Sequence, residues 1–332
     1  MSIKPPMTSL PLIALIDCDF IVYRACAAAE DEIDFGEDVI FVQSRFSDVI
    51  KNISRDLERI HVFLERTYHR EPFLFLLFSD SENFRKLVDP AYKGHRNRKK
   101  PCGYVRAQKT LAASYKVVRL AGLEADDTMG IMSQTLAQAG NEVVICSPDK
   151  DMRQIPGQLW DLNPESRIQH ISPEDGWRWF LTQTMTGDQT DGYSGIPGIG
   201  KVKADALIDK YGPHWETVHQ AFLKAGLTTD DALRNARLAR ILTADDFDFA
   251  TGTPRLWEPR GTDGGPAVRS DLQPDPLGAD GSQPPGGVPD PWGLSSSASS
   301  DHGSDFGAAT EDRDSAAPTQ KRRLQKRKGQ DA

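Results

Sequence analysis

Three short apolar runs, each followed by acidic residues, dominate the first half of the chain. They are residues 12–16 before Asp17, residues 73–78 before Asp80, and residues 143–146 before Asp149 and Asp151. Short continuous apolar runs bounded by polar residues are typical of buried strands in a parallel sheet. Ligand sites in open parallel sheets lie beyond the carboxyl ends of the strands, so we expect these carboxylates to converge there.

Helical periodicity separates the predicted strands. Residues 40–66 carry apolar side chains at the 3.6-residue spacing of a helix that packs on a sheet. Residues 124–139 repeat this pattern, and Gly140 suits the end of a helix just before the third strand. The alternation predicts an α/β fold, with a mainly parallel central sheet flanked by helices, over residues 1–172.

The pattern changes twice in the second half of the chain. Residues 173–250 read as a helical subdomain, with a short helix near residues 177–180, another over about 201–211, and more helix between 215 and 242. After residue 250, Gly, Pro, Ser and Asp dominate, so residues 251–332 are predicted to be a disordered tail. It ends in a basic block, residues 321–328, for which a solvated tail and a weak tether to DNA or a partner both stay open.

Charge distribution matters more than net charge in this chain. The net charge of −8 taken alone argues against a nucleic-acid binder. Between residues 81 and 123, however, only Glu82 and Asp89 are acidic, while eleven residues are Lys or Arg. A basic arm between acidic strand ends is the pattern expected of a protein that neutralises phosphates while holding cations beside them.

Other composition features exclude several classes. The four cysteines lack C-x-x-C spacing, so neither a zinc site nor a disulfide framework is indicated. No signal peptide and no membrane span are predicted, and we expect a cytoplasmic protein with reduced thiols, in the host cytoplasm if a phage encodes it.

Further acidic residues strengthen the expectation of a metal site. Glu124, Asp126 and Asp127 begin a predicted helix, where the helix dipole alone would favour them by about 0.3–1 kcal/mol each. Asp149 and Asp151 alternate along an extended end, so both could face one way. Two carboxylates ~4 Å apart repel by about 4 kcal/mol at an effective dielectric near 20, so the cluster needs counter-charge, and divalent metal is the obvious candidate.

A glycine-rich run at residues 195–201 is the remaining motif. It is not a phosphate-binding loop of the P-loop type, because Val202 stands where Ser or Thr is required and no strand precedes it. A helix-hairpin-helix fits, with backbone N–H groups of the second helix facing a phosphate and Lys201 and Lys203 adding charge. A simple tight turn is the alternative.

Together these motifs resemble the 5′-to-3′ exonuclease and flap endonuclease family over about residues 12–242, and most of all the exonucleases of short-tailed lytic phages. The resemblance implies a PIN-like 5′-nuclease fold with a helical arch near residues 81–123 and a helix-hairpin-helix subdomain. The metal ligands that it implies are Asp17, Asp80, Glu124, Asp126, Asp127, Asp149, Asp151, Asp188 and Asp191. Lys93 and Arg96 are the implied catalytic residues that contact the scissile phosphate, and the implied DNA contacts are Arg24, Tyr92 (stacked on a base), Arg98, Lys99, Lys100, Gly195, Gly198, Gly200, Lys201 and Lys203.

The same resemblance implies two-metal phosphodiester hydrolysis with Mg²⁺ or Mn²⁺, and a K⁺ ion at the helix-hairpin-helix. The expected partner is duplex DNA with a 5′ end or 5′ flap, with an RNA–DNA hybrid as a further substrate, bound by a monomer. A non-catalytic DNA-binding protein that kept the fold is the alternative. A small ribonuclease of the related toxin type fits less well, because it would need neither the arm nor the hairpin.

Overall fold

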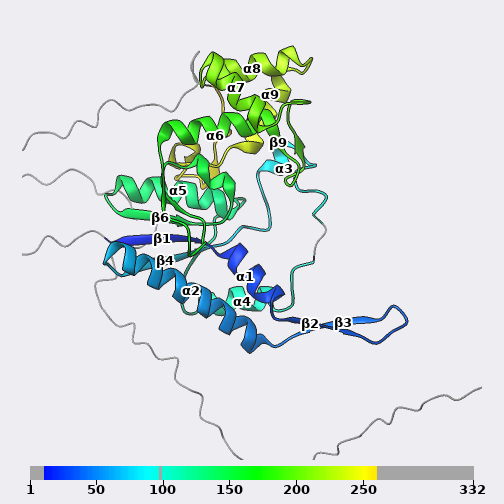
Figure 1. Cartoon of the computed structure of the whole chain (residues 1–332), viewed down its shortest axis with the longest axis vertical. Helices are drawn as coiled ribbons and strands as arrows, with labels where there is room; N and C mark the ends of the chain where they lie inside the picture. The colour runs from blue at the N-terminus through cyan, green and yellow to red at the C-terminus, as the bar shows by residue number, and fades with distance from the viewer. Residues whose placement is uncertain (1–10, 97–98, 260–332) are drawn as a thin grey trace, which may run out of the picture. The chain divides into compact units, whose positions relative to one another are not determined.

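The computed structural model of the protein describes residues 11–96 and 99–259. A six-stranded sheet lies at its centre, in the order β5-β4-β1-β6-β7-β8 (Figure 1). The three predicted strands are present as β1 (Leu12–Asp17), β4 (Pro72–Leu77) and β6 (Glu142–Cys146). β1 pairs in parallel with both of the others, so the predicted α/β fold with a mainly parallel sheet is confirmed.

Three shorter strands, which the sequence did not reveal, complete the sheet. β5 (Lys116–Val118) pairs in parallel with β4, β7 (Gly157–Trp160) in parallel with β6, and β8 (Gln169–Ile171) antiparallel to β7. Runs of three or four residues are too short for an alternating pattern to stand out from the flanking loops.

Helices cover both faces of the sheet, because alternate side chains of the central strand point to opposite sides. Leu12, Ala14 and Ile16 share one apolar core with α1 (Cys18–Ala27), α2 (Phe46–Tyr68) and α4 (Tyr104–Ala112). α5 (Ala125–Gln138) packs on the other face (Figure 1). All of β1 is therefore buried, as expected of a strand covered twice.

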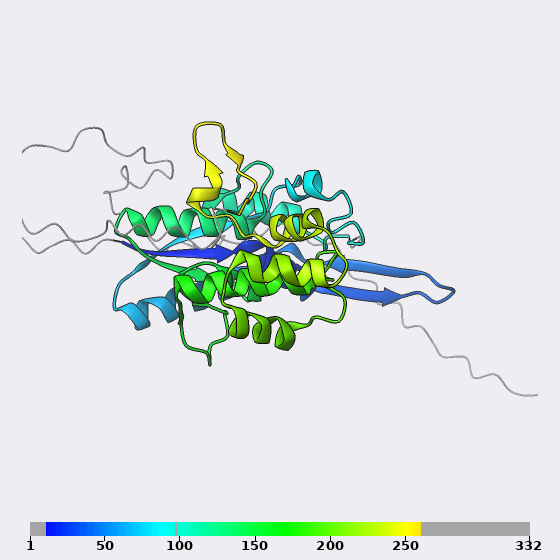
Figure 2. The same ribbon diagram turned by 90° about the horizontal axis from the view of Figure 1, so that it is seen from above.

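The prediction of a helix from residue 40 is wrong for its first residues. β2 (Glu30–Asp34) and β3 (Ile40–Ser44) form an antiparallel hairpin that extends away from the sheet, and α2 begins only at Phe46 (Figure 2). Ile40, Phe41 and Val42 are β-branched or aromatic residues that favour a strand, and this local preference prevailed over the helical spacing.

The second half of the chain is helical, as predicted. Its helices are α6 (Pro173–Thr186), α7 (Lys201–Tyr211), α8 (Trp215–Lys224) and α9 (Thr229–Ala239). They share a second core that includes Trp177, Phe180, Trp215 and Phe222. Both cores belong to one compact unit, and the division of the chain near residue 172 stays a prediction.

The predicted start of the tail at residue 251 is too early. Trp257 is 8% exposed and its ring lies 4.8 Å from that of Trp215, so the chain still packs on the second core at this point. Residues 260–332, including the basic block at 321–328, lie outside the described residues. Among the described residues, no helix combines the length and the apolar character needed to cross a membrane.

The remaining elements are short. They are α3 (Arg85–Val88), the 3₁₀ helices η1 (Lys150–Gln154) and η2 (Ala244–Asp246), the pair β9 (Gly187–Asp188) and β10 (Tyr193–Ser194), and the pair β11 (Phe247–Asp248) and β12 (Thr253–Pro254). The predicted arch region contains α3 and α4, and residues 97 and 98 within it lie outside the described part.

Candidate active site

A cavity of about 950 Å³ lies at the carboxyl ends of β1, β4 and β6. The acidic residues that line it are Asp17, Asp19, Asp80, Glu124, Asp126, Asp149, Asp151 and Asp191. Asp188 lies beside it, with its Oδ2 3.0 Å from Lys150 Nζ. The expected convergence of the strand-end carboxylates is thus confirmed, whereas their roles stay predictions.

The strand ends hold the first two carboxylates through backbone groups. Asp17 caps α1, because its Oδ1 accepts from Phe20 N at 3.1 Å, and Ser147 Oγ donates to its other oxygen at 3.0 Å. The oxygens of Asp80 accept from Gly122 N and Ser81 N, each at 2.8 Å. Each carboxylate is therefore fixed at the edge of the sheet before any ligand arrives.

The start of α5 supplies the next group. Glu124 is its N-cap and forms a capping box with Asp127, so the expected first-turn placement is confirmed. Asp126 lies in the same turn and lines the cavity. The positive end of the helix dipole faces these carboxylates and offsets part of their mutual repulsion.

Asp149 and Asp151 lie in a tight turn and not along an extended end as predicted. Asp149 caps η1, and its Oδ1 accepts from Asp151 N at 2.8 Å. The Oδ1 atom of Asp151 is buried and has no hydrogen-bond partner within the described chain. A buried carboxylate oxygen without a donor within the chain is costly, so the position of this atom suits a bound cation.

Burial and mutual repulsion make the cavity hard to ionise fully. Burial, together with Asp19, raises the pKa of Asp17 to about 6, and burial, together with Asp149, raises that of Asp151 to about 7. Burial also raises the pKa of Asp126 well above its usual range, with Asp149 and Asp17 adding to the effect. A cation among these groups would favour their charged forms and so oppose all three shifts.

Basic side chains of the arm enter the same cavity. Lys93 Nζ lies 2.5 Å from Glu124 Oε1 and 3.6 Å from Asp191 Oδ2, and Arg96 Nη2 lies 2.7 Å from Asp191 Oδ1. Burial opposes the charge of Glu124, yet Lys93 and Arg85 keep its pKa below the usual value. The predicted phosphate contacts are thus in the cavity, where they are paired with carboxylates.

Two predicted roles are wrong in this structure. Tyr92 is 2% exposed, with its hydroxyl 2.8 Å from Asp191 Oδ2 and 3.1 Å from Glu124 Oε2, so its ring is not available to stack on a base. Asp127 is completely buried, and Arg85 Nη1 and Nη2 donate to its two oxygens at 2.7 and 2.8 Å. That carboxylate is therefore not open to a metal ion.

The predicted DNA contacts Arg24, Lys99 and Lys100 differ in how accessible they are. Arg24 is paired with Asp56 at 2.7 Å, although its side chain remains 40% exposed. Lys99 and Lys100 are exposed, and Lys100 lines the cavity. Arg98 lies outside the described residues. These four residues keep their predicted role without further support.

The glycines of the predicted hairpin fall into two groups. A Cβ on Gly195 would lie 2.1 Å from the backbone of Thr186, so this position has no room for a side chain. Gly198 and Gly200 have open space around them, and Gly198 adopts a positive φ of 74°. α7 begins at Lys201 directly after them, as predicted.

The two lysines next to this loop already have partners within it. Lys201 Nζ lies 2.5 Å from Asp205 Oδ2, and Lys203 Nζ donates to Gly198 O at 2.8 Å. The ammonium group of Lys203 thus takes one loop carbonyl that the expected K⁺ ion could have used, and the structure lends that ion no separate support.

Several cavity residues were missed by sequence reasoning. Asp19 accepts from Ser79 N at 2.7 Å, and Tyr104 points its hydroxyl at the same carboxylate. Ser147 Oγ donates to Asp17 Oδ2, and Arg85 Nη1 lies 3.5 Å from Glu124 Oε2. The two-residue spacing of Asp17 and Asp19 was a usable signal, whereas nothing distinguishes Arg85 from the other basic residues of the arm.

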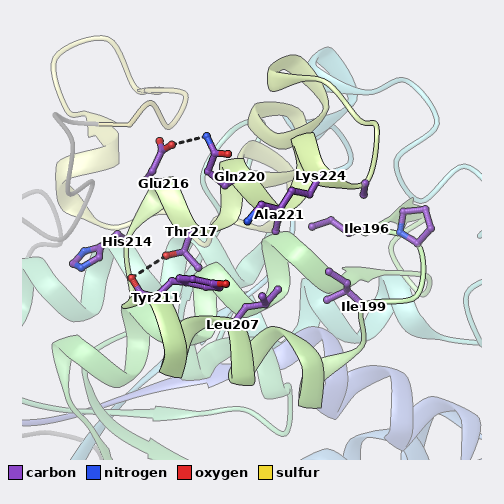
Figure 3. Close-up of a pocket in the computed structure, with 12 residues that line it drawn as sticks. Ile196, Ile199, Leu207, Tyr211, His214, Glu216, Thr217, Gln220, Ala221 and Lys224 are labelled. Carbon is purple, nitrogen blue, oxygen red and sulfur yellow. Dashed lines mark hydrogen bonds between the residues drawn. The ribbon is translucent and has the colours of Figure 1, made fainter.

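A second, mainly apolar cavity of about 650 Å³ lies between the glycine loop, α7 and α8 (Figure 3), and its lining shares no residue with that of the acidic cavity. Ile199, Leu207 and Tyr211 form part of its wall. Within the described residues, no three acidic, histidine or cysteine side chains are close enough to hold a metal ion as they stand. Glu124, Asp188 and Asp191 are paired with Lys or Arg as they stand, so they would have to turn from these partners toward an ion.

Comparison with known proteins defines the class of this fold and site. Residues 12–175 match the family described as 5′-3′ exonuclease, N-terminal resolvase-like domain. The exonuclease of Escherichia phage T7 is 31% identical over 286 residues, which cover 74% of this chain and 93% of that protein. The exodeoxyribonuclease of Enterobacteria phage T3 is also 31% identical, with 75% and 93% covered. The chain therefore belongs to the 5′-3′ exonuclease family.

A solved structure agrees on the fold. The T5 5′-exonuclease with bound zinc ions superposes with a TM-score of 0.52 at 16% identity, and the match covers 69% of this chain and 89% of that one. At this identity the likeness concerns the fold, and it agrees with the predicted 5′-nuclease architecture.

Proposed function

We propose that the protein is a metal-dependent 5′-to-3′ exonuclease that hydrolyses phosphodiester bonds in DNA and also cuts 5′ flaps. Its membership of the exonuclease family makes it a nuclease. The observation that carries the proposal is the single cavity in which carboxylates from three strand ends meet basic side chains of the arm. Such a cavity suits a phosphodiester held between cations and Lys or Arg.

The chemistry of the donors favours hard divalent cations, Mg²⁺ or Mn²⁺. The acidic residues that line the cavity offer carboxylate oxygens, and these two ions prefer oxygen ligands. Asp151 Oδ1, buried without a donor, and the raised pKa of Asp126 both support a cation at this place. The proposed ligands are Asp17, Asp80, Glu124, Asp126, Asp149, Asp151, Asp188 and Asp191. Bound ions would activate water and stabilise the leaving oxygen.

The chain's own basic groups would bind and orient the phosphate. Lys93 and Arg96 would oppose charge on the phosphoryl oxygens if Glu124 and Asp191, their present carboxylate partners, held a cation instead. Preorganised donors of this kind are worth about 10²- to 10³-fold in rate. Lys99 and Lys100 would bind backbone phosphates, which gives affinity without sequence preference.

The glycine loop would bind the duplex. Open space at Gly198 and Gly200 lets a phosphate approach the backbone N–H groups at the start of α7. We propose duplex DNA with a 5′ end or 5′ flap as the substrate of a monomer, with an RNA–DNA hybrid as a second substrate and the cytoplasm as the place of action.

An assay on end-labelled duplex and 5′-flap DNA tests the proposal. Wild-type protein should release 5′ products with Mg²⁺ or Mn²⁺ and none in excess chelator. Asp151→Asn should be nearly inactive but folded, whereas Asp230→Asn, at an exposed position on α9, should match the wild type. Binding of the DNA without cleavage at any metal concentration would instead support a non-catalytic DNA-binding protein.

A further inference from the structure

Residues 238–242 comprise the last two residues of α9 and the three that follow it, and three of the five line the acidic cavity. We call these five residues the crosspiece. Five of its backbone groups are bound by the side chains of only three residues, Arg85, Asp127 and Gln154. All three of these side chains are buried, so water does not compete for the bonds.

Arg85 and Asp127 hold the two ends of the crosspiece. Arg85 Nε donates to Leu238 O at 2.9 Å and its Nη2 donates to Arg240 O at 2.5 Å. Asp127 Oδ1 accepts from Leu242 N at 3.1 Å. Asp127 directly follows Asp126, so this end of the crosspiece is tied to the helix turn that supplies cavity carboxylates.

Gln154 holds the middle. Its Nε2 donates to Ala239 O at 2.6 Å and its Oε1 accepts from Ile241 N at 3.1 Å. Gln154 ends η1, the short turn that contains Asp151. Its Nε2 also lies 2.6 Å from Gln183 Oε1 on α6.

The helix that leads into the crosspiece, α9, also contacts the chain next to the glycine loop. Asn235, on α9 and completely buried, donates from its Nδ2 to Ser194 O at 2.8 Å and to Thr184 O at 3.3 Å. Ser194 immediately precedes the loop at residues 195–200. Through α9 and these hydrogen bonds, the loop is therefore linked to the turn that contains Asp126 and to the turn that contains Asp151.

We propose that the crosspiece fixes the position of the cavity carboxylates relative to the glycine loop, and that Gln154, Arg85 and Asn235 are positioning residues for cleavage of duplex DNA. The inference rests on the proposed function, in which the loop binds duplex and the carboxylates hold the cations. A substrate held at the loop is cut efficiently only if the two sites keep their spacing, since a displacement of about 1 Å can cost about 10²-fold in rate. A short single strand reaches the cavity without the loop and does not need this spacing.

The test compares Gln154→Met with Gln158→Met. Methionine keeps the length of the side chain and removes both hydrogen bonds to the crosspiece. Gln158 is the matched control, because it also bonds through its amide, to Tyr68 and Glu142, but does not touch the crosspiece. Single-turnover rates are measured with Mg²⁺ on a long end-labelled duplex and on a short single strand, and Mn²⁺ binding is measured by calorimetry without DNA.

Gln154→Met should lose about 10²-fold on the duplex, keep most of its rate on the single strand, and bind Mn²⁺ as the wild type does. Gln158→Met should resemble the wild type on both substrates. Equal losses on both substrates, or a matching loss of Mn²⁺ affinity, would show that Gln154 only supports Asp151 and would overturn the proposal.

Asn235→Ala repeats the test at the far end of the connection, and it decides the question if Gln154→Met does not fold. Because Asn235 bonds to Thr184 and Ser194 and to no cavity carboxylate, it should show the same selective loss on duplex. A wild type that cuts neither substrate would refute the proposed function itself. An active wild type with an unselective Asn235→Ala refutes the role of the crosspiece alone.

Discussion

Replacing Asp127 by Asn tests whether this carboxylate serves the fold or a metal ion. The change removes one charge and leaves the shape of the side chain almost unchanged. Both oxygens of Asp127 bind the guanidinium of Arg85, and both side chains are buried. Breaking such a pair from one side costs about 3–5 kcal/mol, because the remaining charge is left uncompensated.

The structure places the expected loss at the lower end of that range. Glu124 Oε2 lies 3.5 Å from Arg85 Nη1 and still supplies part of the missing counter-charge. We therefore expect a loss of about 3 kcal/mol in the free energy of unfolding. At roughly 2–4 °C per kcal/mol for a domain of 150–250 residues, the melting temperature should fall by about 6–12 °C.

The neighbouring Asp126→Asn provides the contrast. Burial and the adjacent acids raise the pKa of Asp126, so its charge opposes folding at neutral pH when no metal is bound. Asp126→Asn should therefore stabilise the metal-free protein and weaken Mn²⁺ binding, while Asp127→Asn should destabilise the protein and leave Mn²⁺ binding unchanged. Thermal unfolding and calorimetric Mn²⁺ titration measure both effects. An Asp127→Asn variant with unchanged stability and no Mn²⁺ binding would refute the reasoning and restore Asp127 as a ligand.

Three further predictions concern pH, the arm and the end of the described chain. Folding raises the pKa of Asp17 to about 6 and that of Asp151 to about 7. The metal-free protein should therefore lose stability as the pH rises from below 4 through about 7, and Mg²⁺ should reduce this loss. A free energy of unfolding that is independent of pH would contradict the reasoning. Lys93→Ala should lower the single-turnover rate far more than duplex affinity, while Lys100→Ala should weaken binding and flatten its salt dependence; the opposite pattern in rates and binding isotherms would exchange their roles. Trp257→Ala should cost about 3–5 kcal/mol in urea unfolding, whereas truncation after residue 259 should leave the chemical rate unchanged, and a large loss on truncation would show that the later residues contribute to catalysis.

The sequence predicted those elements correctly whose pattern depends on neighbouring residues alone. β1, β4 and β6 were predicted because strands covered on both faces must be apolar throughout, and their carboxylates converge because parallel strands end at the same edge. The bounds of α7 agree with prediction because Gly200 and Gly212 flank it. The family resemblance then grouped the acidic motifs into one set of expected metal ligands.

The sequence failed where the environment is decided by distant residues. Eleven basic residues of the arm look alike, and Arg85 turns inward because Asp127 and the carbonyls of Leu238 and Arg240 bind it there. Tyr92 sits in a motif that predicts an exposed ring, yet its hydroxyl lies between Glu124 and Asp191 in the folded chain. Neither contact can be read from spacing, because the partners are up to 155 positions apart.

The hairpin of β2 and β3 gives the protein a region that can open by itself. Its strands pair only with each other, and the side chains of Phe35 and Phe41 are 69% and 57% exposed. A two-stranded ribbon without a covered face is marginally stable, so its amide protons should exchange with solvent long before those of the central sheet. Within residues 11–96 and 99–259, a protease should cut in this hairpin before it cuts the central sheet, and both cores should stay intact. Because Glu30 in this hairpin accepts from Cys102 N at 2.6 Å, opening it would also release the point where the arm returns to the sheet domain.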